Sequence, residues 1–393
     1  MRSFWWLLLV SSFWLAACTP APRQPRPIPF PTNKKGVHLL LDDGRQAWPI
    51  SLWGEHMAAA AATVGKDGYV LQLVRADDLD VARWQHFLDL CAQYELRPIL
   101  RLATTFDRAG GYWTRPEAGP AGDYATSAAA YAHFIAALDW PAESHFVIIG
   151  NEPNHGEEWG GRVDPAGFAR FFLTTARALH AADPDAIVLN APLDQFAPHT
   201  NGQPLANGFT YLDATSFLDA MVAAEPAWLA ELDGWASHSY PLGPFSRPPE
   251  EQLFGIDLLN GAERLGSGEV PAGLYNRGIA GYEWELYQLS TYGVRGLPVF
   301  ITETGWRHQE SEMEEALDGG PAGLPDSATA AGYLETAFRE QWLLDNRVYA
   351  VIPFAFNGLP AEWGHSNWLR LNEAGAVLGM YAMGARWAGL PPE

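Results

Sequence analysis

The chain has few cysteines and few basic residues for its length. Two of its 393 residues are cysteine, so at most one intrachain disulfide can form. Lysine and arginine number 25 against 46 aspartates and glutamates, which gives a formal net charge of −21 at pH 7. A chain of this charge repels phosphate backbones and anionic lipid, so we expect no nucleic-acid partner. An acidic polysaccharide is an equally poor fit for a ligand.

Several motifs that carry chemistry are also missing. The first apolar run continues as HLLLDDGRQAW, which lacks the glycine spacing of a phosphate-binding or dinucleotide-binding loop. No Gly-x-Ser-x-Gly elbow of a serine hydrolase is present. The segments HFLDLCAQYE and GEHM lack the convergent spacing of an H-E-x-x-H metal site. The sequence therefore predicts no metal site and no cofactor.

The N-terminus carries the one long apolar stretch, in MRSFWWLLLVSSFWLAACTP. Residues 4–17 are too few to span a bilayer comfortably and fit the apolar region of a signal peptide. The stretch ends Leu-Ala-Ala-Cys18, which resembles a bacterial lipobox. That resemblance implies a mature protein lipidated on Cys18 and held on the extracytoplasmic side of the bacterial cell envelope. The alternatives are an ordinary signal peptide and an N-terminal anchor helix.

The segment after the lipobox is rich in proline and predicts a stiff, extended tether over residues 18–35. A signal peptide over residues 1–17 and one folded domain over residues 36–393 complete the predicted organisation. The second cysteine, Cys91, lies in WQHFLDLCAQY, where we expect a small buried apolar side chain on a helix.

Short apolar runs alternate with longer helical segments from residue 36 onward. The runs are near-continuous in apolar residues, as is typical of strands covered on both faces. The segments between them, such as residues 77–95 and 164–183, begin with acidic residues that favour a helix N-terminus. The eight runs are GVHLLLD (36–42), YVLQLVR (69–75), RPILRL (97–102), FVIIGNE (146–152), AIVLNAP (186–192), GWASHSY (234–240), PVFITE (298–303) and YAVIPFAF (349–356).

Eight strand–helix pairs predict an α/β fold, a single (β/α)₈ or TIM barrel. The alternative is a doubly wound open sheet, which the missing glycine-rich loop disfavours. In a barrel, the long irregular stretches 103–124, 241–274 and 304–326 lie on the C-terminal face, where binding sites form.

Polar residues end four of these runs. They are Arg75 in the second run, Asn151 and Glu152 in the fourth, His238 and Tyr240 in the sixth, and Glu303 in the seventh. The C-terminal ends of barrel strands converge on one mouth, so the two glutamates should face each other across a single pocket. Paired carboxylates suit glycoside hydrolysis, in which one delivers a proton to the leaving oxygen and the other acts at the anomeric carbon.

These motifs resemble the clan A retaining glycoside hydrolases, which include cellulases, β-mannanases, β-xylosidases and β-1,3-glucanases. GNEP resembles the strand-four motif of that superfamily and ITETGW its strand-seven motif. The resemblance covers roughly residues 36–388. It implies that Glu152 is the acid/base, that Glu303 is the nucleophile, and that Asn151 binds the sugar 2-hydroxyl.

The same resemblance assigns four supporting residues. HSY resembles the strand-six His-x-Tyr, which gives His238 and Tyr240, the tyrosine contacting the nucleophile. Arg75 fits an arginine that steadies the nucleophile, and Trp306 of ITETGW is assigned to the substrate. The resemblance implies a neutral, β-linked oligo- or polysaccharide as substrate, and we expect a monomer.

One motif departs from the superfamily, because the strand-eight tryptophan that floors the sugar subsite is missing from PFAFNG. Phe354, Phe356 or Trp363 are the candidates to replace it. Tyr112, Trp113 and Trp159 are candidates to stack on sugars in outer subsites. A non-catalytic carbohydrate-binding lipoprotein on the same barrel is the alternative function, because fold does not decide activity.

Overall fold

A computed structural model of the protein describes residues 23–120, 122–252, 277–309 and 324–392. The predicted signal peptide and the predicted lipidation site Cys18 lie outside the described residues. Within the described part of the chain, no helix combines the length and the apolar character needed to cross a membrane.

Eight parallel strands form the centre of the molecule. They are β1 (Gly36–Leu39), β2 (Tyr69–Arg75), β3 (Arg97–Ala103), β6 (His145–Ile149), β7 (Ala186–Leu189), β8 (Trp235–His238), β9 (Val299–Glu303) and β10 (Val348–Val351). Ladders join β1-β2-β3-β6-β7 and β8-β9-β10. Two parallel bridges, Leu189 with Gly234 and Lys35 with Val351, join these two sheets at both edges. The strands therefore close into the predicted α/β barrel.

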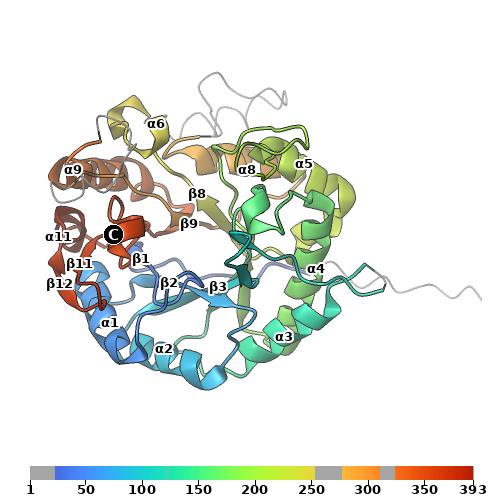
Figure 1. The fold of residues 1–393 in the computed structure, drawn as a ribbon, viewed down its shortest axis with the longest axis horizontal. Coiled ribbons are helices and arrows are strands. Elements are labelled where there is room, and N and C mark those ends of the chain that lie inside the picture. The colour runs from blue at the N-terminus through green and yellow to red at the C-terminus, as the bar shows by residue number, and fades with distance from the viewer. Residues whose placement is uncertain (1–22, 121, 253–276, 310–323, 393) are drawn as a thin grey trace, which may run out of the picture.

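Helices surround the strands as a ring, with one or more between successive strands (Figure 1). Their bounds are α1 Ile50–Val64, α2 Val81–Gln93, α3 Ala125–Ala136, α4 Pro165–Ala182, α5 Ala214–Ala224, α6 Leu242–Phe245, α8 Gly281–Thr291, α9 Ser327–Ala337, α10 Pro360–Trp363 and α11 Ala382–Ala388. Two short hairpins, β4 (Phe106–Asp107) with β5 (Tyr112–Trp113) and β11 (Leu369–Leu371) with β12 (Val377–Met380), are added outside the barrel sheet.

Aspartates fix the beginnings of four of these helices. Asp80, Asp164, Asp213 and Asp326 precede α2, α4, α5 and α9, and each accepts hydrogen bonds from backbone amides of the first turn. A side-chain acceptor at this position satisfies amides that have no partner within the helix. Part of the acidic surplus of the sequence therefore serves to set helix boundaries.

Two apolar layers hold the barrel together. The inner layer fills the barrel with side chains from every strand except β1, and the outer layer packs the strands against the helices. Cys91 lies on α2 and is fully buried in the outer layer, as predicted, and its thiol is free. The inner layer consists of Tyr69, Leu71, Ile99, Phe146, Ile148, Ile187, Leu189, Ala236, Phe300, Ala350 and Ile352.

Residues 23–35 lie across the N-terminal end of the barrel and close it. The Arg23 guanidinium lies 2.6 Å from Asp233 Oδ1, and the backbone amide of Arg26 donates to the same oxygen at 2.7 Å. Ile28 packs against the inner apolar layer. This segment forms the floor of the barrel.

Two buried lysines complete the floor. Lys34 Nζ donates to the Asp345 carbonyl at 2.9 Å, and Lys35 Nζ donates to the Leu390 carbonyl at 2.9 Å. The segment predicted as a stiff, extended tether over residues 18–35 is therefore bound to the barrel from residue 23 onward. Its basic side chains explain the difference, because they find carbonyl and carboxylate acceptors that a proline-based prediction does not consider.

Candidate active site

The fourth barrel strand, β6, ends in a turn that presents two polar side chains to the mouth. Gly150 has φ +88°, a conformation that favours glycine, and it lets the chain leave the strand sharply. Glu152 also has a positive φ, +32°, and its amide donates to the Pro192 carbonyl at 2.9 Å. A non-glycine residue held at positive φ is uncommon and is concentrated at functional sites.

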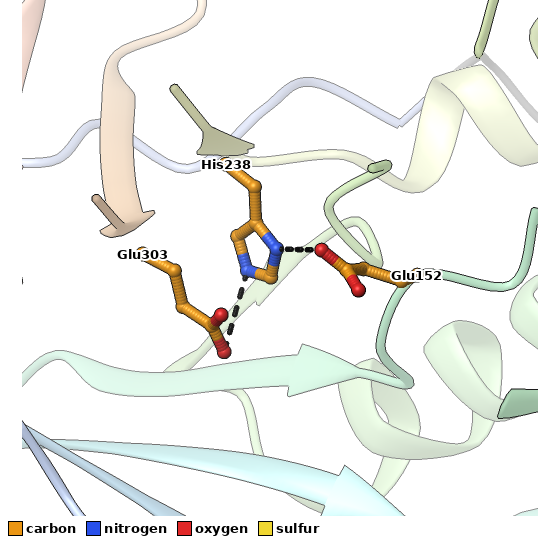
Figure 2. Close-up of side chains that lie close together, drawn as sticks. All are labelled: Glu152, His238 and Glu303. Atoms are coloured by element: carbon orange, nitrogen blue, oxygen red, sulfur yellow. Dashed lines mark hydrogen bonds and ion pairs between the residues drawn. The ribbon is translucent and has the colours of Figure 1, made fainter. Parts of the chain in front are cut away.

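The two glutamates face each other with an imidazole between them, as Figure 2 shows. His238 Nδ1 lies 2.6 Å from Glu152 Oε1, and His238 Nε2 lies 3.7 Å from Glu303 Oε1. One carboxylate oxygen of Glu152 and one of Glu303 lie within 4.8 Å of each other. The pairing of β8 with β9 shifts register between Ser237 and His238, which sets the imidazole opposite Glu303.

Glu303 lies in a strongly polar environment although it is 93% buried. Arg101 Nη1 donates to Glu303 Oε1 at 2.7 Å, and the Tyr240 hydroxyl donates to Oε2 at 3.0 Å. Burial by itself raises the pKa of Glu303, but the positive charges of His238 and Arg101 outweigh burial and hold this pKa below its usual range. Glu303 is therefore an ionised carboxylate at neutral pH.

Arg101, and not Arg75, is the arginine at Glu303. Arg75 forms ion pairs with Asp42 and Asp77 at the edge of the mouth, so its predicted contact with the nucleophile is wrong. Arg101 lies inside the apolar run RPILRL, and its guanidinium also donates to Asn151 Oδ1 at 2.7 Å. A charged side chain within an otherwise buried strand needs buried partners, and this signal was available in the sequence.

The aromatic residues of the predicted site are divided between the cavity and the core. Trp306 is 2% exposed, donates from Nε1 to the Arg247 carbonyl at 2.8 Å, and is not among the described residues that line the cavity. Trp159 is 1% exposed within the outer apolar layer. Trp113 does line the cavity. The substrate contacts expected of Trp306 and Trp159 are therefore not supported by their positions, because packing buries both rings.

The mouth of the barrel holds a cavity of about 320 Å³. Two of the three candidates for the missing strand-eight tryptophan, Phe354 and Trp363, line it, whereas Phe356 is fully buried. The Phe354 and Trp363 rings lie edge to face with centroids 4.8 Å apart. Phe196 and Phe245 line the cavity as well. Polar groups and aromatic faces in one concave site are typical of small-molecule and sugar binding.

Two cavity residues, His155 and Glu158, were not found from the sequence. They follow the NEP motif in NEPNHGEEW, and Glu158 ends the short helix η1 (Gly156–Glu158). Burial lowers the pKa of His155, but the hydrogen bond to Asp194 and the Glu152 charge outweigh burial and raise this pKa to about 9. Burial, aided by the Glu152 charge, raises the pKa of Glu158 to about 7. His155 and Glu158 are three residues apart, and residues at this spacing lie on the same side of a 3₁₀ turn. This spacing is the sequence signal that could have identified both as cavity residues.

The donor atoms of Glu152, His238 and Glu303 are also of the kinds that bind a divalent cation such as zinc. The Arg101 guanidinium, 2.7 Å from the Glu303 oxygen, opposes a cation at this position. The expected absence of a metal stays a prediction.

Comparison with solved structures places the fold among glycoside hydrolases. A glucosidase from Croceicoccus marinus has a TM-score of 0.52 at 13% sequence identity, over 93% of this chain and 68% of its own. A fungal β-1,4-galactanase has a TM-score of 0.50 at 14% identity, over 91% of this chain and 99% of its own. No protein-family profile and no curated protein sequence matches the chain. The predicted resemblance to the clan A barrels is confirmed at the level of the fold.

Proposed function

We propose that the protein is a retaining glycoside hydrolase in which Glu303 is the nucleophile and Glu152 the acid/base. The observation that carries this proposal is the carboxylate pair, whose oxygens lie within 4.8 Å of each other across the mouth of the barrel. Direct attack by a carboxylate requires a separation of about 5–5.5 Å, whereas an intervening water requires about 6.5–9.5 Å. The short separation therefore favours retention of the anomeric configuration.

The first step forms a covalent glycosyl-enzyme. Glu303, kept ionised by Arg101 and Tyr240, attacks the anomeric carbon while the bond to the leaving oxygen breaks. The leaving oxygen takes a proton from Glu152, which shares that proton with His238 over 2.6 Å.

The second step returns the enzyme to its starting state. A water molecule gives its proton to Glu152 and attacks the anomeric carbon, and the bond from the sugar to Glu303 breaks with its electrons returning to the carboxylate. Arg101 stabilises that returning charge.

The substrate that we propose is a neutral, β-linked oligo- or polysaccharide. Asn151 accepts from Arg101 through Oδ1, which leaves its Nδ2 free to donate to a sugar hydroxyl. Phe354 and Trp363 offer apolar faces for a sugar ring at the place of the missing tryptophan. These groups support an enzyme over a non-catalytic binding protein, which has no need to keep Glu303 ionised beside a second carboxylate.

The experiment that tests this proposal is trapping of the covalent intermediate. The purified protein is incubated with a panel of 2-deoxy-2-fluoro glycosides that carry activated leaving groups, and its intact mass is measured. We expect a mass increase that peptide mapping places on Glu303, and the sugar that reacts begins to define the substrate. A label on another residue, or a Glu303→Gln variant labelled as fast as the wild type, contradicts the assignment.

We also propose that the protein is a lipoprotein of the bacterial cell envelope, anchored through Cys18. The support is the Leu-Ala-Ala-Cys sequence that ends the apolar N-terminal stretch. Mass spectrometry of the mature N-terminus tests this proposal. A diacylated or triacylated Cys18 is the expected result, and cleavage at another position rejects it.

A further inference from the structure

One buried imidazole in the barrel has no hydrogen-bond partner among the described residues. His38, the third residue of β1, is 0% exposed, and neither of its ring nitrogens is hydrogen-bonded to any residue that the structure describes. His56 is also 0% exposed, but its ring nitrogens lie 2.7 Å from the Gly375 carbonyl and 2.6 Å from the Asn357 amide. Buried polar groups are almost always hydrogen-bonded, and an exception requires an explanation.

The position of His38 suggests that explanation. Its Nε2 lies 3.5 Å from Glu303 Oε1, beside the bond from Arg101 to the same oxygen. Its ring lies edge to face with Phe354, with centroids 5.0 Å apart. The Phe354 amide donates to the carbonyl of Thr304, the residue after the glutamate, at 2.9 Å. The imidazole therefore lies between the proposed nucleophile and an aromatic ring of the cavity.

The charge of His38 fits a donor role. Burial and the adjacent Arg101 charge lower the pKa of His38 to about 3, so the imidazole is neutral at physiological pH. A neutral imidazole has one N–H group and can direct it at a carboxylate without adding a further buried positive charge.

The two oxygens of Glu303 are held unequally. Oε1 accepts from Arg101 and lies 3.5 Å from His38 Nε2, whereas Oε2 accepts only from Tyr240 among the residues described here. We propose that His38 is a positioning residue that directs Nε2–H at Oε1, so that Oε2 is the oxygen that attacks the sugar. This inference rests on the function proposed above.

The consequence for the reaction falls mainly on the second step. When Oε2 has bonded to the anomeric carbon, Oε1 is the carbonyl oxygen of the ester. As water attacks and the bond from carbon to Oε2 breaks, the electron pair returns to the carboxylate, and a donor at Oε1 stabilises that charge. Loss of the donor therefore slows the release of the sugar from Glu303.

The test compares His38→Leu with His38→Gln. Leucine removes both ring nitrogens at similar volume, whereas the glutamine side-chain amide reaches the place of Nε2. For the glycoside that labels the wild type, supplied with a natural 2-hydroxyl and a dinitrophenyl leaving group, we expect His38→Leu to lower kcat about 10- to 100-fold. KM stays equal or falls, because the covalent intermediate accumulates. His38→Gln recovers most of the lost kcat.

His145→Gln is the matched control, because His145 begins β6 at the opposite end of the barrel, paired with Asp183. We expect it to keep wild-type kcat. If the leucine and glutamine variants have equal kcat, or if His38→Leu keeps wild-type kcat while fluoroglycosides label the wild type, the role of His38 is wrong and the proposed function stands. A wild-type protein that no fluoroglycoside labels overturns both.

Discussion

Each end of the barrel buries a carboxylate beside an arginine and a histidine, but the two carboxylates differ in how fully they are hydrogen-bonded. At the floor, Asp233 has four donors for its two oxygens: Arg23 and the Arg26 amide at Oδ1, and His180 and the Val188 amide at Oδ2. Their distances are 2.6, 2.7, 3.0 and 3.0 Å. This carboxylate is saturated with hydrogen bonds and has no capacity left for a ligand.

At the mouth, the groups around Glu303 are incompletely paired. His38 has no hydrogen-bond partner in the described chain, and His238 Nε2 likewise has none there. His38 Nε2 lies 3.5 Å and His238 Nε2 lies 3.7 Å from Glu303 Oε1, at ion-pair distance but longer than an ordinary N–H···O hydrogen bond. The comparison teaches that buried charge alone does not identify a functional site in this protein. The carboxylate itself distinguishes the mouth from the floor. Glu303 Oε2 accepts only from Tyr240 among the described residues, whereas each oxygen of Asp233 accepts two hydrogen bonds.

The largest expected effect comes from removing the carboxylate at the mouth. Glu303→Gln keeps the size of the side chain but removes the nucleophile, so we expect kcat to fall by more than about 10⁴-fold. Steady-state kinetics on the glycoside that labels the wild type measures this loss. Turnover within tenfold of the wild type would contradict the assignment of Glu303 as the nucleophile.

Loss of the acid/base should depend on the leaving group. Glu152→Ala is expected to lower kcat/KM by about 10²–10⁴-fold for a poor leaving group and much less for dinitrophenolate, which leaves without a proton. Comparing aryl glycosides of graded leaving-group pKa measures the difference. Added azide should restore turnover of the activated substrate, because a small anion attacks without base assistance, and the product is a glycosyl azide of retained configuration. Equal losses for all leaving groups would reject the role of Glu152.

At the floor, the same kind of substitution should affect stability and not catalysis. Asp233→Asn leaves Arg23 without its charged partner and leaves His180 paired with Glu231 alone, and we expect a loss of about 3 kcal/mol in the free energy of unfolding. Urea unfolding measures it, while kcat of the folded enzyme stays at the wild-type value. The control is Asp185→Asn, whose ion pair with Arg26 is partly exposed and should contribute less than about 1 kcal/mol.

The stability that Asp233 contributes at the floor should also depend on pH. Burial raises the pKa of Asp233, but the hydrogen bonds from His180 and two backbone amides outweigh burial and lower it. A lowered folded-state pKa stabilises the protein above the unfolded value of about 3.9, and this contribution is lost as the pH falls through the folded-state value. The stability difference between wild type and Asp233→Asn should therefore shrink below about pH 4. A constant difference down to pH 2 would show that charge is not its origin.

The smallest effect expected is that of Glu158 on the pH profile. With its pKa raised to about 7, Glu158 is neutral below that pH and adds a negative charge near Glu152 above it. That charge disfavours a second ionised carboxylate. We expect Glu158→Gln to remove an inflection near pH 7 from kcat/KM, changing its value less than about tenfold. An unaltered profile would place Glu158 outside the electrostatics of the mouth.

The barrel was predictable because its signal is repeated eight times. Each strand is an apolar run followed by a helical segment, and the polar residues that end the runs meet at one mouth in any such barrel. Glu152, His238, Tyr240 and Glu303 were brought together as expected. Periodicity and strand-end position are sufficient for residues of this kind.

Side-chain partners were not predictable in the same way. Arg75 and Arg101 both lie near the C-terminal ends of neighbouring strands, and the nearby Asp42 and Asp77 decide which arginine remains for Glu303. His38 has no motif, and its relevance depends on a distance between β1 and β9, two strands separated by β10. Which basic side chain contacts Glu303 depends on competition among charges that meet only in the folded structure. The local sequence pattern does not show that competition.

The closed floor has a consequence for how the protein faces its surroundings. Five peptide steps separate Cys18 from Arg23, and even a fully extended chain spans only about 3.3–3.6 Å per residue. If Cys18 carries the proposed lipid, the floor is held within roughly 20 Å of the bilayer. The mouth lies at the opposite end of the barrel axis, so it opens outward. With that anchor, the protein would have one fixed orientation, in which polymers arriving from outside would meet the cavity before they meet the membrane.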